Sequence, residues 1–385
     1  MRICFVGLDN LPVLAPEHRH HTIGGESVQQ TLLARALARR GHDVRMVVAD
    51  HGQPDGASWD GVRTFKAYQT DAGVPVLRFI HPRWTGLWSA LARADAELYY
   101  ASCAGMHVGL LALFCSQHDR RFVFRTASDS DCDPERLLVR FARDRWLYAL
   151  GLRRADAILV QSAAQARALA LNYGLAGRVA TMLVEPAQAA GTRDIDVLWI
   201  SNVRRVKRPD RMIELAARLP QLRVHIAGGP LAGEEALYRD IKRAAAALPN
   251  VVFHDRVSYS DANALYARAR VLVNTSEIEG FPNAYLQAWT RGTPVVTLLD
   301  PDGIIEREQL GIAARTAQQL LDGVRALLAD RIGWQMASDR CRAFVGREYA
   351  EDKVLATYLD TFEDVLRRDG TNAPMVLAGD TRRHA

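Results

Sequence analysis

The sequence predicts an α/β protein built from two Rossmann-like domains, each with a parallel sheet. Short apolar runs alternate with stretches of helical periodicity along nearly the whole chain, which is typical of parallel sheets covered by helices on both faces. The 385 residues also exceed what one ordinary domain holds. The alternation breaks once, at 185–194, and then restarts. We therefore expect domains at 1–187 and 188–368 and a disordered tail at 369–385.

The first half contains five apolar runs of strand length, separated by helical stretches. A helix is expected from Val28 to Leu37, because apolar residues recur there at helical spacing and Gly41 stands where a C-cap belongs. A second helix is expected at 134–152. The predicted strands are 2–6, 43–49, 96–101, 121–126 and 157–161.

The second half starts after a linker. Segment 185–194 lacks apolar periodicity and contains Pro, Gly and small residues. A helix is predicted at 209–218, and one long helix at 349–368 is expected to close back toward the N-terminal domain. The predicted strands are 197–200, 224–227, 251–254, 271–274 and 294–298. Two such domains are expected to face each other across a cleft. Open α/β sheets bind ligands at the carboxyl ends of their strands, so the loops that follow strands should carry the function.

Composition excludes several classes of protein. No apolar stretch approaches the roughly 20 residues of a membrane span. The five cysteines are scattered without CxxC spacing, which favours reduced thiols in a cytoplasmic protein and argues against a zinc site. The first residues resemble a strand and not a signal peptide. The net charge of +5 favours an anionic partner, such as a nucleotide, a phospholipid surface or a phosphorylated carrier. No nucleic-acid-binding motif is present.

The most informative segment follows the strand 271–274 and reads SEIEGFPNAYLQAWTRGTP. Pro282 suits the first turn of a helix, because its missing N–H would be unpaired there in any case. The free amides at such a helix start attract a phosphate or a polar sugar. The amides expected to face the cleft are those of Gly280, Phe281 and Asn283.

Two polar positions flank that turn. Glu279 precedes it, where a carboxylate can accept hydrogen bonds from sugar hydroxyls. Asn283 and Gln287 are four residues apart, so they share one face of the predicted helix.

A second segment, SNVRRVKRP at 201–209, follows the first strand of the second half. Its four cations lie between a strand and a helix, and so in a loop that faces the cleft. Breaking a sugar–phosphate bond builds negative charge on the leaving oxygen, which cations already in place stabilise. Read without this context, the same run would be a solvated basic surface.

These segments resemble the GT-B glycosyltransferases of family 4, whose signature is two glutamates separated by seven residues. Glu279 matches the first glutamate, which in the family contacts the donor sugar. The second position falls on Gln287 and departs from the pattern. The family's glutamate there binds the ribose hydroxyls, and a glutamine can accept the same hydrogen bonds.

The resemblance extends to other loops. The family uses an arginine and a lysine in the basic loop, and Arg204 and Lys207 match them, with Arg208 as the alternative. Gly25, in the pair Gly24-Gly25, resembles the glycine loop that approaches the diphosphate. Gly228 matches a further turn. Many family members also have a histidine after a central N-terminal strand. Here that stretch, 124–131, contains none.

The resemblance implies a retaining transfer of sugar from a nucleotide-diphosphate donor to a saccharide or glycolipid acceptor. No essential metal and no cofactor are expected. It also implies cell-surface polysaccharide or glycolipid assembly, with peripheral contact at the inner face of a membrane. Alternatives are a sugar-nucleotide epimerase on the same fold and a nonenzymatic two-domain binding protein. A nicotinamide-dependent oxidoreductase is disfavoured, because no G-x-G-x-x-G follows the first strand.

Three further patterns have a structural interpretation beside a functional one. The histidines at 18, 20 and 21 are a weak metal motif without an acidic partner pattern. The acids at 129 and 131 invite a metal-diphosphate interpretation. The helical stripe Trp84, Leu87, Trp88 and Leu91 favours a buried face over a membrane-touching one.

Overall fold

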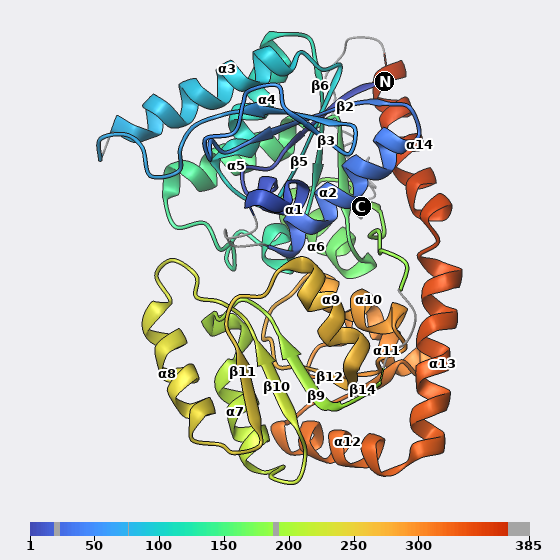
Figure 1. Cartoon of the computed structure of the whole chain (residues 1–385). Coiled ribbons are helices and arrows are strands. Elements are labelled where there is room, and N and C mark those ends of the chain that lie inside the picture. The colour runs from blue at the N-terminus through green and yellow to red at the C-terminus, as the bar shows by residue number, and fades with distance from the viewer. Residues whose placement is uncertain (19–23, 76, 188–191, 369–385) are drawn as a thin grey trace, which may run out of the picture. The chain divides into compact units, whose positions relative to one another are not determined.

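The computed structural model describes residues 1–18, 24–75, 77–187 and 192–368. The chain forms two compact units (Figure 1). The first unit comprises Met1–Ala15, Glu26–Thr181 and the C-terminal segment from Leu355, and the second comprises Pro16–Gly25 and Met182–Val354. The predicted tail at 369–385 and part of the predicted linker lie outside the described residues.

Within the described residues, the first unit contains an eight-stranded sheet. Its strands are β1 (Arg2–Val6), β2 (Asp43–Val48), β3 (Ser58–Trp59), β4 (Val62–Lys66), β5 (Leu98–Ser102), β6 (Arg121–Arg125), β7 (Ala157–Val160) and β8 (Arg178–Val179). They lie in the order β3-β4-β2-β1-β5-β6-β7-β8, and all neighbours are parallel except β3 and β4. The strand order reverses between β1 and β5, as in a doubly wound fold.

Helices cover this sheet. They are α1 (Leu11–Leu14), α2 (Gly25–Arg39), α3 (Thr85–Ala94), α4 (Met106–Gln117), α5 (Ala142–Arg154) and α6 (Ala163–Tyr173), with short helical turns η1 (Pro16–His18), η2 (Leu77–Phe79), η3 (Ile80–Trp84) and η4 (Asp129–Cys132). One face of the sheet packs against α3, α4 and α5 in a continuous apolar core. The predicted C-cap of α2 is present, because Gly41 adopts φ 83° and the amide of His42 donates to Leu37 O at 3.2 Å.

The structure differs from one expectation for this unit and agrees with another. The helix predicted at 134–152 begins only at Ala142. The side chain of Arg145 donates to the carbonyls of Leu137 and Val139, both at 3.1 Å, so these carbonyls are not part of a helical ladder. In the stripe that starts at Trp84, Leu87 and Leu91 are buried and the two tryptophans pack against the same core.

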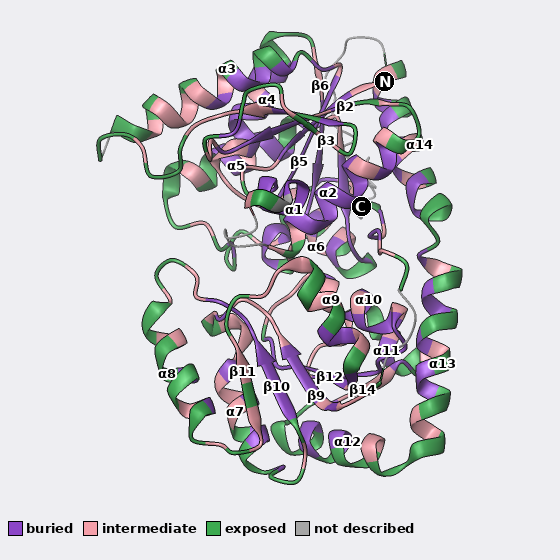
Figure 2. Ribbon diagram, viewed as in Figure 1, coloured by how far each residue is buried: buried purple, intermediate pink, exposed green. Residues whose placement is uncertain are grey.

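The second unit contains, among its described residues, a six-stranded parallel sheet. Its strands are β9 (Ile195–Ile200), β10 (Val224–Ala227), β11 (Val251–His254), β12 (Ala269–Asn274), β13 (Val295–Thr297) and β14 (Gly311–Ala313). The order is β11-β10-β9-β12-β13-β14, with every pair parallel. This is the doubly wound order, and it reverses between β9 and β12. Figure 2 shows that the central strands are buried.

The helices of the second unit are α7 (Pro209–Ala217), α8 (Glu235–Ala246), α9 (Tyr259–Arg268), α10 (Asn283–Thr290), α11 (Ile304–Glu308), α12 (Ala317–Ala329) and α13 (Arg331–Glu348), with turns η5 (Arg205–Lys207) and η6 (Pro301–Gly303). Alternate strand residues enter two cores, one on each face. Leu198 and Leu272 enter one, and Val197 and Val271 enter the other. The two parallel-sheet units confirm the predicted α/β fold class.

The last helix, α14 (Glu351–Arg367), corresponds to the helix predicted at 349–368. From Leu355 onward it belongs to the first unit, whereas the sequence-based division assigned 188–368 to the second domain. The rings of Tyr358 and Phe362 pack against Tyr100 at 6.4 and 6.1 Å. The hydroxyl of Tyr358 donates to Thr181 O at 3.1 Å. In the described part of the chain, no helix is both long and apolar enough to cross a bilayer.

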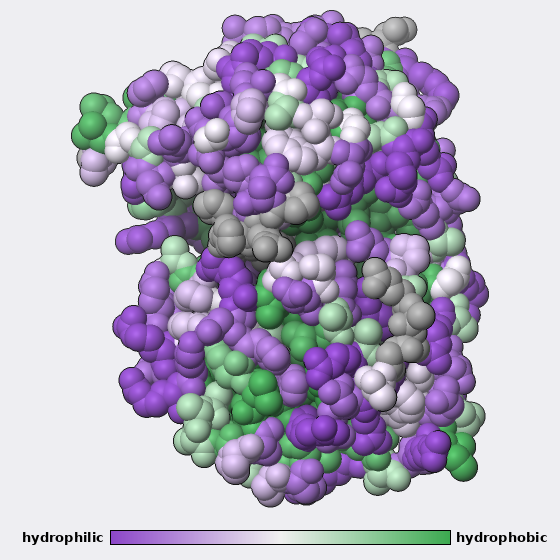
Figure 3. All heavy atoms as spheres, in the orientation of Figure 1, coloured by the Kyte–Doolittle hydropathy of each residue, from purple (hydrophilic) through white to green (hydrophobic). Residues whose placement is uncertain are grey.

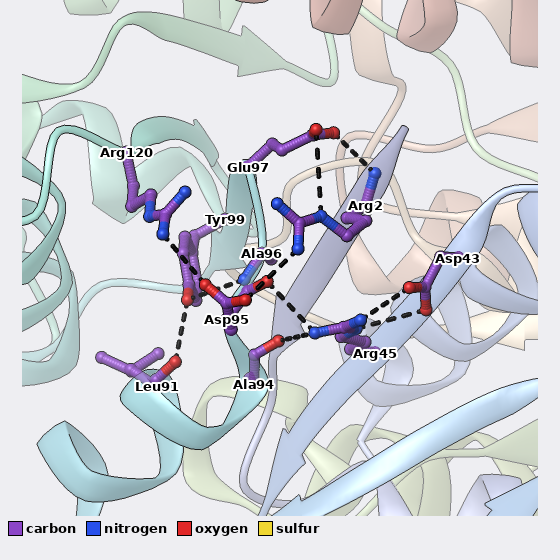
Figure 4. A network of polar contacts seen from close by, with 10 residues as sticks. All are labelled: Arg2, Asp43, Arg45, Leu91, Ala94, Asp95, Ala96, Glu97, Tyr99 and Arg120. Atoms are coloured by element: carbon purple, nitrogen blue, oxygen red, sulfur yellow. Dashed lines mark hydrogen bonds and ion pairs between the residues drawn. The ribbon is translucent and has the colours of Figure 1, made fainter.

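A polar network ties together the amino ends of the first sheet (Figure 4). Asp95 pairs with Arg2 at 3.2 Å and with Arg120 at 2.9 Å, and its carbonyl accepts from Arg45 at 3.1 Å. The amide of Arg2 donates to Glu97 Oε2 at 2.9 Å. These groups stabilise the edge opposite to the one where ligands bind in open α/β sheets.

Candidate functional site

Two loops in the second unit follow neighbouring parallel strands. The loop that contains η5 follows β9, and the loop 275–282 follows β12. β9 and β12 pair directly, at the point where the strand order reverses. Both loops therefore lie at the carboxyl edge, on the two sides of the crevice that forms at such a reversal. The two segments singled out in the sequence are these loops.

Direct contacts join the two loops. Lys207 Nζ lies 2.5 Å from Glu279 Oε1. The backbone is joined as well, because the hydroxyl of Thr275 donates to Lys207 O at 2.7 Å and the amide of Glu277 donates to Val206 O at 2.8 Å. The position of Lys207 relative to Glu279 is thus set by hydrogen bonds to the backbone carbonyls of Val206 and Lys207 as well as by charge.

The carboxylate of Glu279 is held at one oxygen only. Ser276 Oγ donates to Oε1 at 2.7 Å, beside the lysine. Oε2 accepts no hydrogen bond from a described residue. The side chains of Glu279 and Lys207 are only 15% and 18% exposed, so the ion pair is screened less than a surface pair. The arrangement leaves a cation and one carboxylate oxygen available to a polar ligand.

Arg204 and Arg208 differ in whether a carboxylate pairs with them. Arg208 pairs with Asp210 at 2.5 Å and with Glu277 at 2.6 Å. Its hydrogen bonds to these two carboxylates raise its pKa above the ordinary value. Arg204, at the N-cap of η5, pairs with no described carboxylate. Of the two, Arg204 has the guanidinium that an anion can use.

The segment 280–287 forms the start of α10. Pro282 is the N-cap with φ −66° and ψ 119°, so the helix begins one residue later than predicted, at Asn283. Phe281 points into the core, where its ring lies 6.1 Å from that of Trp289. Its contribution to a ligand is therefore limited to the backbone. The side-chain oxygen of Asn283 is buried without a partner among the described residues.

Gln287 lies one turn into α10, close to α9. Burial raises the pKa of Tyr259 to about 12, and hydrogen bonds to Asn263 and Gln287 oppose that rise. Arg291 donates to the backbone carbonyl of Gln287 at 2.9 Å. The side chain of Gln287 thus has the phenol of Tyr259 as a partner, and a side-chain amide can also bond to hydroxyl groups.

The two glycines predicted to bind the donor, Gly228 and Gly25, lie next to different elements. Gly228 follows β10, and a Cβ there would overlap the carbonyl of Ser201. Glycine is therefore required at 228 for the close approach of two backbones. Gly25 is the first residue of α2. A Cβ at Gly25 would lie 2.5 Å from Nδ2 of Asn283, so glycine permits close approach to the start of α10. Its role as a donor-binding residue stays a prediction.

The stretch expected to contain the family's histidine forms the end of β6 and η4. Asp131 Oδ2 accepts from the amides of Ala127 and Ser128 at 2.8 and 3.2 Å, and Asp129 accepts from Gln165 at 2.9 Å. Both carboxylates thus serve local structure. Among the described residues, no three His, Cys, Asp or Glu side chains are grouped as metal ligands. Of the predicted histidine loop, positions 20 and 21 lie outside the described residues.

Sequence reasoning missed several polar partners. Ser276 and Thr275 lie in the loop after β12, so the position of that loop could have identified them. Tyr259 has no such signal, because it reaches the start of α10 from a different helix. The buried pair Arg125 and Glu26, 3.1 Å apart in the first unit, was also missed, since the two residues are distant in sequence.

Comparison with solved structures identifies the fold. Sucrose-phosphate synthase from Thermosynechococcus elongatus is 17% identical with a TM-score of 0.74, covering 94% of this chain and 98% of that one. Anabaena HepE in complex with UDP and glucose is 16% identical with a TM-score of 0.72, covering 94% and 100%. The catalytic domain of starch synthase IV from Arabidopsis thaliana, bound to ADP and acarbose, is 11% identical with a TM-score of 0.70, covering 96% and 100%. The chain has the fold of the GT-B glycosyltransferases.

Comparison with family models identifies the family. The model described as "Glycosyl transferases group 1" matches residues 194–330, and the model described as "Glycosyl transferase 4-like domain" matches residues 24–185. No curated protein matches the sequence. The chain belongs to the group 1, family 4-like glycosyltransferases and is a transferase, which confirms the resemblance predicted from Glu279, Arg204 and Lys207.

Proposed function

We propose that this glycosyltransferase moves a sugar from a nucleoside-diphosphate donor to a hydroxyl of a saccharide or glycolipid acceptor, with retention at the anomeric carbon. The observation that carries the proposal is the contact of Lys207 with Glu279 at the carboxyl edge, between β9 and β12. Likeness to structures that contain UDP or ADP together with saccharides supports this class of donor and acceptor.

Lys207 and Arg204 stabilise the leaving group. In the transfer, the bond between the sugar's anomeric carbon and the phosphate oxygen breaks, and the electron pair stays on that oxygen. The acceptor oxygen forms the new bond, and its proton passes to the departing diphosphate. Cations already fixed at the leaving oxygen stabilise the developing charge without reorganisation. Lys207 is fixed in this way by its contact with Glu279.

Glu279 holds the sugar. Its Oε1 is occupied by Lys207 and Ser276, so Oε2 is the acceptor for a sugar hydroxyl. The amides at the start of α10, around Gly280 and Asn283, receive the diphosphate or a polar edge of the sugar. Gln287 accepts from the ribose hydroxyls in place of the family's glutamate. No cofactor or essential metal takes part in this scheme.

The acceptor side follows from the resemblance. The family assigns the acceptor to the N-terminal domain and the donor to the C-terminal domain, across a cleft. We extend this to cell-surface polysaccharide or glycolipid assembly, where the acceptor presents a sugar hydroxyl. Product analysis after incubation with lipid-linked or free saccharides identifies which acceptor class is used.

The first prediction tests Glu279 against a matched neighbour. Glu279→Ala should lower sugar transfer by a factor of about 100 or more, because a preorganised contact to the reacting sugar is lost. Glu277→Ala removes a carboxylate from the same loop, but one that is half exposed and paired with Arg208 and Arg211, and should leave transfer near the wild-type rate. Transfer is measured as nucleoside diphosphate released from UDP-, ADP- and GDP-sugars with a saccharide mixture.

Two results would contradict the proposal. Normal transfer by a folded Glu279→Ala variant would remove the site assignment. Conversion of the donor to an isomer with no acceptor present would indicate epimerisation instead of transfer. Thermal shift with each nucleotide sugar selects the donor beforehand, because a ligand stabilises the state that it binds.

A further inference from the structure

An exposed apolar and basic surface lies on the first unit, in segments 77–84 and 136–146. Large apolar side chains, each 55% to 63% exposed, are Leu77, Ile80, Leu138, Phe141 and Trp146. Figure 3 shows hydrophobic side chains projecting from this unit beside the start of α3. Scattered single apolar residues are ordinary on a protein surface, but a group on adjoining segments indicates an interaction site. We call this set the apolar–basic surface.

The two segments adjoin and are held in place. Arg143 Cζ, on α5, lies 3.5 Å from the ring centre of Phe79, at the end of η2. The ring of Phe79 packs edge-on against Trp84 at 5.8 Å, and both pack against the apolar core beneath. The apolar–basic surface is therefore anchored to the core of the unit, and it presents its apolar side chains from a folded base.

This surface is strongly basic as well as apolar. The two segments contain six arginines and one aspartate, which gives a net charge of +5, equal to that of the whole chain. The aspartate, Asp144, pairs with Arg143 at 2.7 Å. Among the described residues, no carboxylate pairs with Arg78, Arg136 or Arg140. The remainder of the chain is neutral, so its basic character is concentrated here.

The positive charge and the exposed apolar side chains together favour one kind of partner. A second copy of the chain would bring +5 against +5, which disfavours pairing through this surface. A purely electrostatic partner would leave the exposed Phe and Trp unused. We infer that the apolar–basic surface docks on an anionic lipid bilayer, with Leu, Ile, Phe and Trp side chains entering the interface and arginines contacting lipid phosphates. These residues differ from the buried face of the Trp84 stripe.

The experiment uses the full chain and vesicles without donor or acceptor, so its outcome is independent of the transfer reaction. Co-sedimentation should show binding to phosphatidylglycerol vesicles and little binding to phosphatidylcholine vesicles. The double variant Phe141→Ser/Trp146→Ser should bind at least about tenfold more weakly, and so should Arg136→Ser/Arg140→Ser. The fold should survive, because these positions are exposed and a serine at 141 is a favourable N-cap for α5.

Matched controls lie on α6 of the same unit. Leu171 is 84% exposed and Arg167 is also exposed, so Leu171→Ser/Arg167→Ser removes the same types of side chain elsewhere. This control should bind like the wild type. Wild-type binding to no vesicle, or equal loss in the control, would overturn the inference. Binding that falls with the arginine variant but not with the apolar variant, and that dextran sulfate competes away, would assign the surface to a soluble polyanion and would also overturn it.

Discussion

The side chain of Asp131 forms hydrogen bonds that hold the local structure, but burial disfavours its ionised form. It is nearly inaccessible, and it accepts hydrogen bonds from the amides of Ala127 and Ser128. Burial raises its pKa from 3.8 to about 6, and the two hydrogen bonds offset only part of that rise. The folded chain therefore holds a proton at Asp131 more tightly than the unfolded chain does.

This pKa leads to a prediction on stability. Because the folded pKa lies above the unfolded one, the contribution of Asp131 is fully present below about pH 4 and is lost as the pH rises through about 6. The loss amounts to roughly 3 kcal/mol. Asp131→Asn keeps an oxygen for the two amides but does not titrate. Urea unfolding at about pH 4.5 and about pH 7 should show a smaller pH dependence in the variant. Equal dependence in both proteins would contradict the assignment.

At the same scale, the sequence locates the loops of the site but not the partners that each side chain binds in the folded protein. Glu279 and Lys207 could be placed because each follows an apolar run that is plainly a strand. The choice between Arg204 and Arg208 could not be made, since it depends on Asp210 and Glu277, which occupy Arg208 only in the folded chain. The catalytic and binding roles of these residues stay predictions.

At the scale of elements, α4 and α5 cross at glycines. A Cβ on Gly109 would come within 2.8 Å of the carbonyl carbon of Leu147, and one on Gly151 would lie 2.7 Å from the carbonyl carbon of Val108. Both contacts are with backbone, which cannot rotate away. The two helices can approach this closely only because neither glycine carries a side chain.

We therefore expect Gly109→Ala to destabilise the protein by about 1–3 kcal/mol, as overpacking does. Gly346 provides the contrast. It lies in the exposed interior of α13, and apart from the adjacent residues and the backbone of its own helix, no atom of the described residues comes within 4 Å of the place that a methyl group would take. Gly346→Ala should stabilise the protein by up to about 1 kcal/mol, because alanine favours the helix. Urea unfolding of both variants measures the difference. Similar effects of the two substitutions would contradict the packing argument.

Element prediction succeeded where the local pattern is strong. All ten predicted strands are present, with ends within two residues, because each is a clear apolar run. The strands β3, β4, β8 and β14 were missed. β3, β8 and β14 are only two or three residues long and carry no periodicity, and β4 reads VRTFK, which is not a continuous apolar run. Segment 134–141 was assigned to the helix predicted at 134–152, which begins only at Ala142. Its carbonyls instead bond to Arg145, a tertiary effect that the local sequence does not contain.

At the scale of the whole molecule, the last helix completes the core of the first unit. Phe362 is fully buried against Tyr100. Phe362→Ala should lower the free energy of unfolding by about 3–5 kcal/mol, the range for deleting a buried ring. Glu363→Ala, at the next position, removes only an exposed pair with Arg367 and should change stability by less than about 0.5 kcal/mol. Urea unfolding of the two variants tests this, and a small effect of Phe362→Ala would contradict it.

The helix is expected to close back toward the N-terminal domain, but its own pattern does not identify the residues that it covers. The sequence shows an amphipathic helix near the C-terminus, and the pattern identifies its apolar face. The partner of that face is Tyr100, which lies far earlier in the chain and which no local signal indicates. A periodic pattern specifies that a face is buried, and the topology of the chain decides where.

The division of the chain has a consequence for biogenesis. The second unit is nearly continuous, whereas the first needs residues from both ends of the described chain. A ribosome releases Met182–Val354 before it releases Phe362, so the later-encoded unit can finish its core while the earlier one still waits for its last helix. Vectorial synthesis thus reverses the order of completion, and the nascent first unit keeps Tyr100 uncovered until Phe362 has been synthesised.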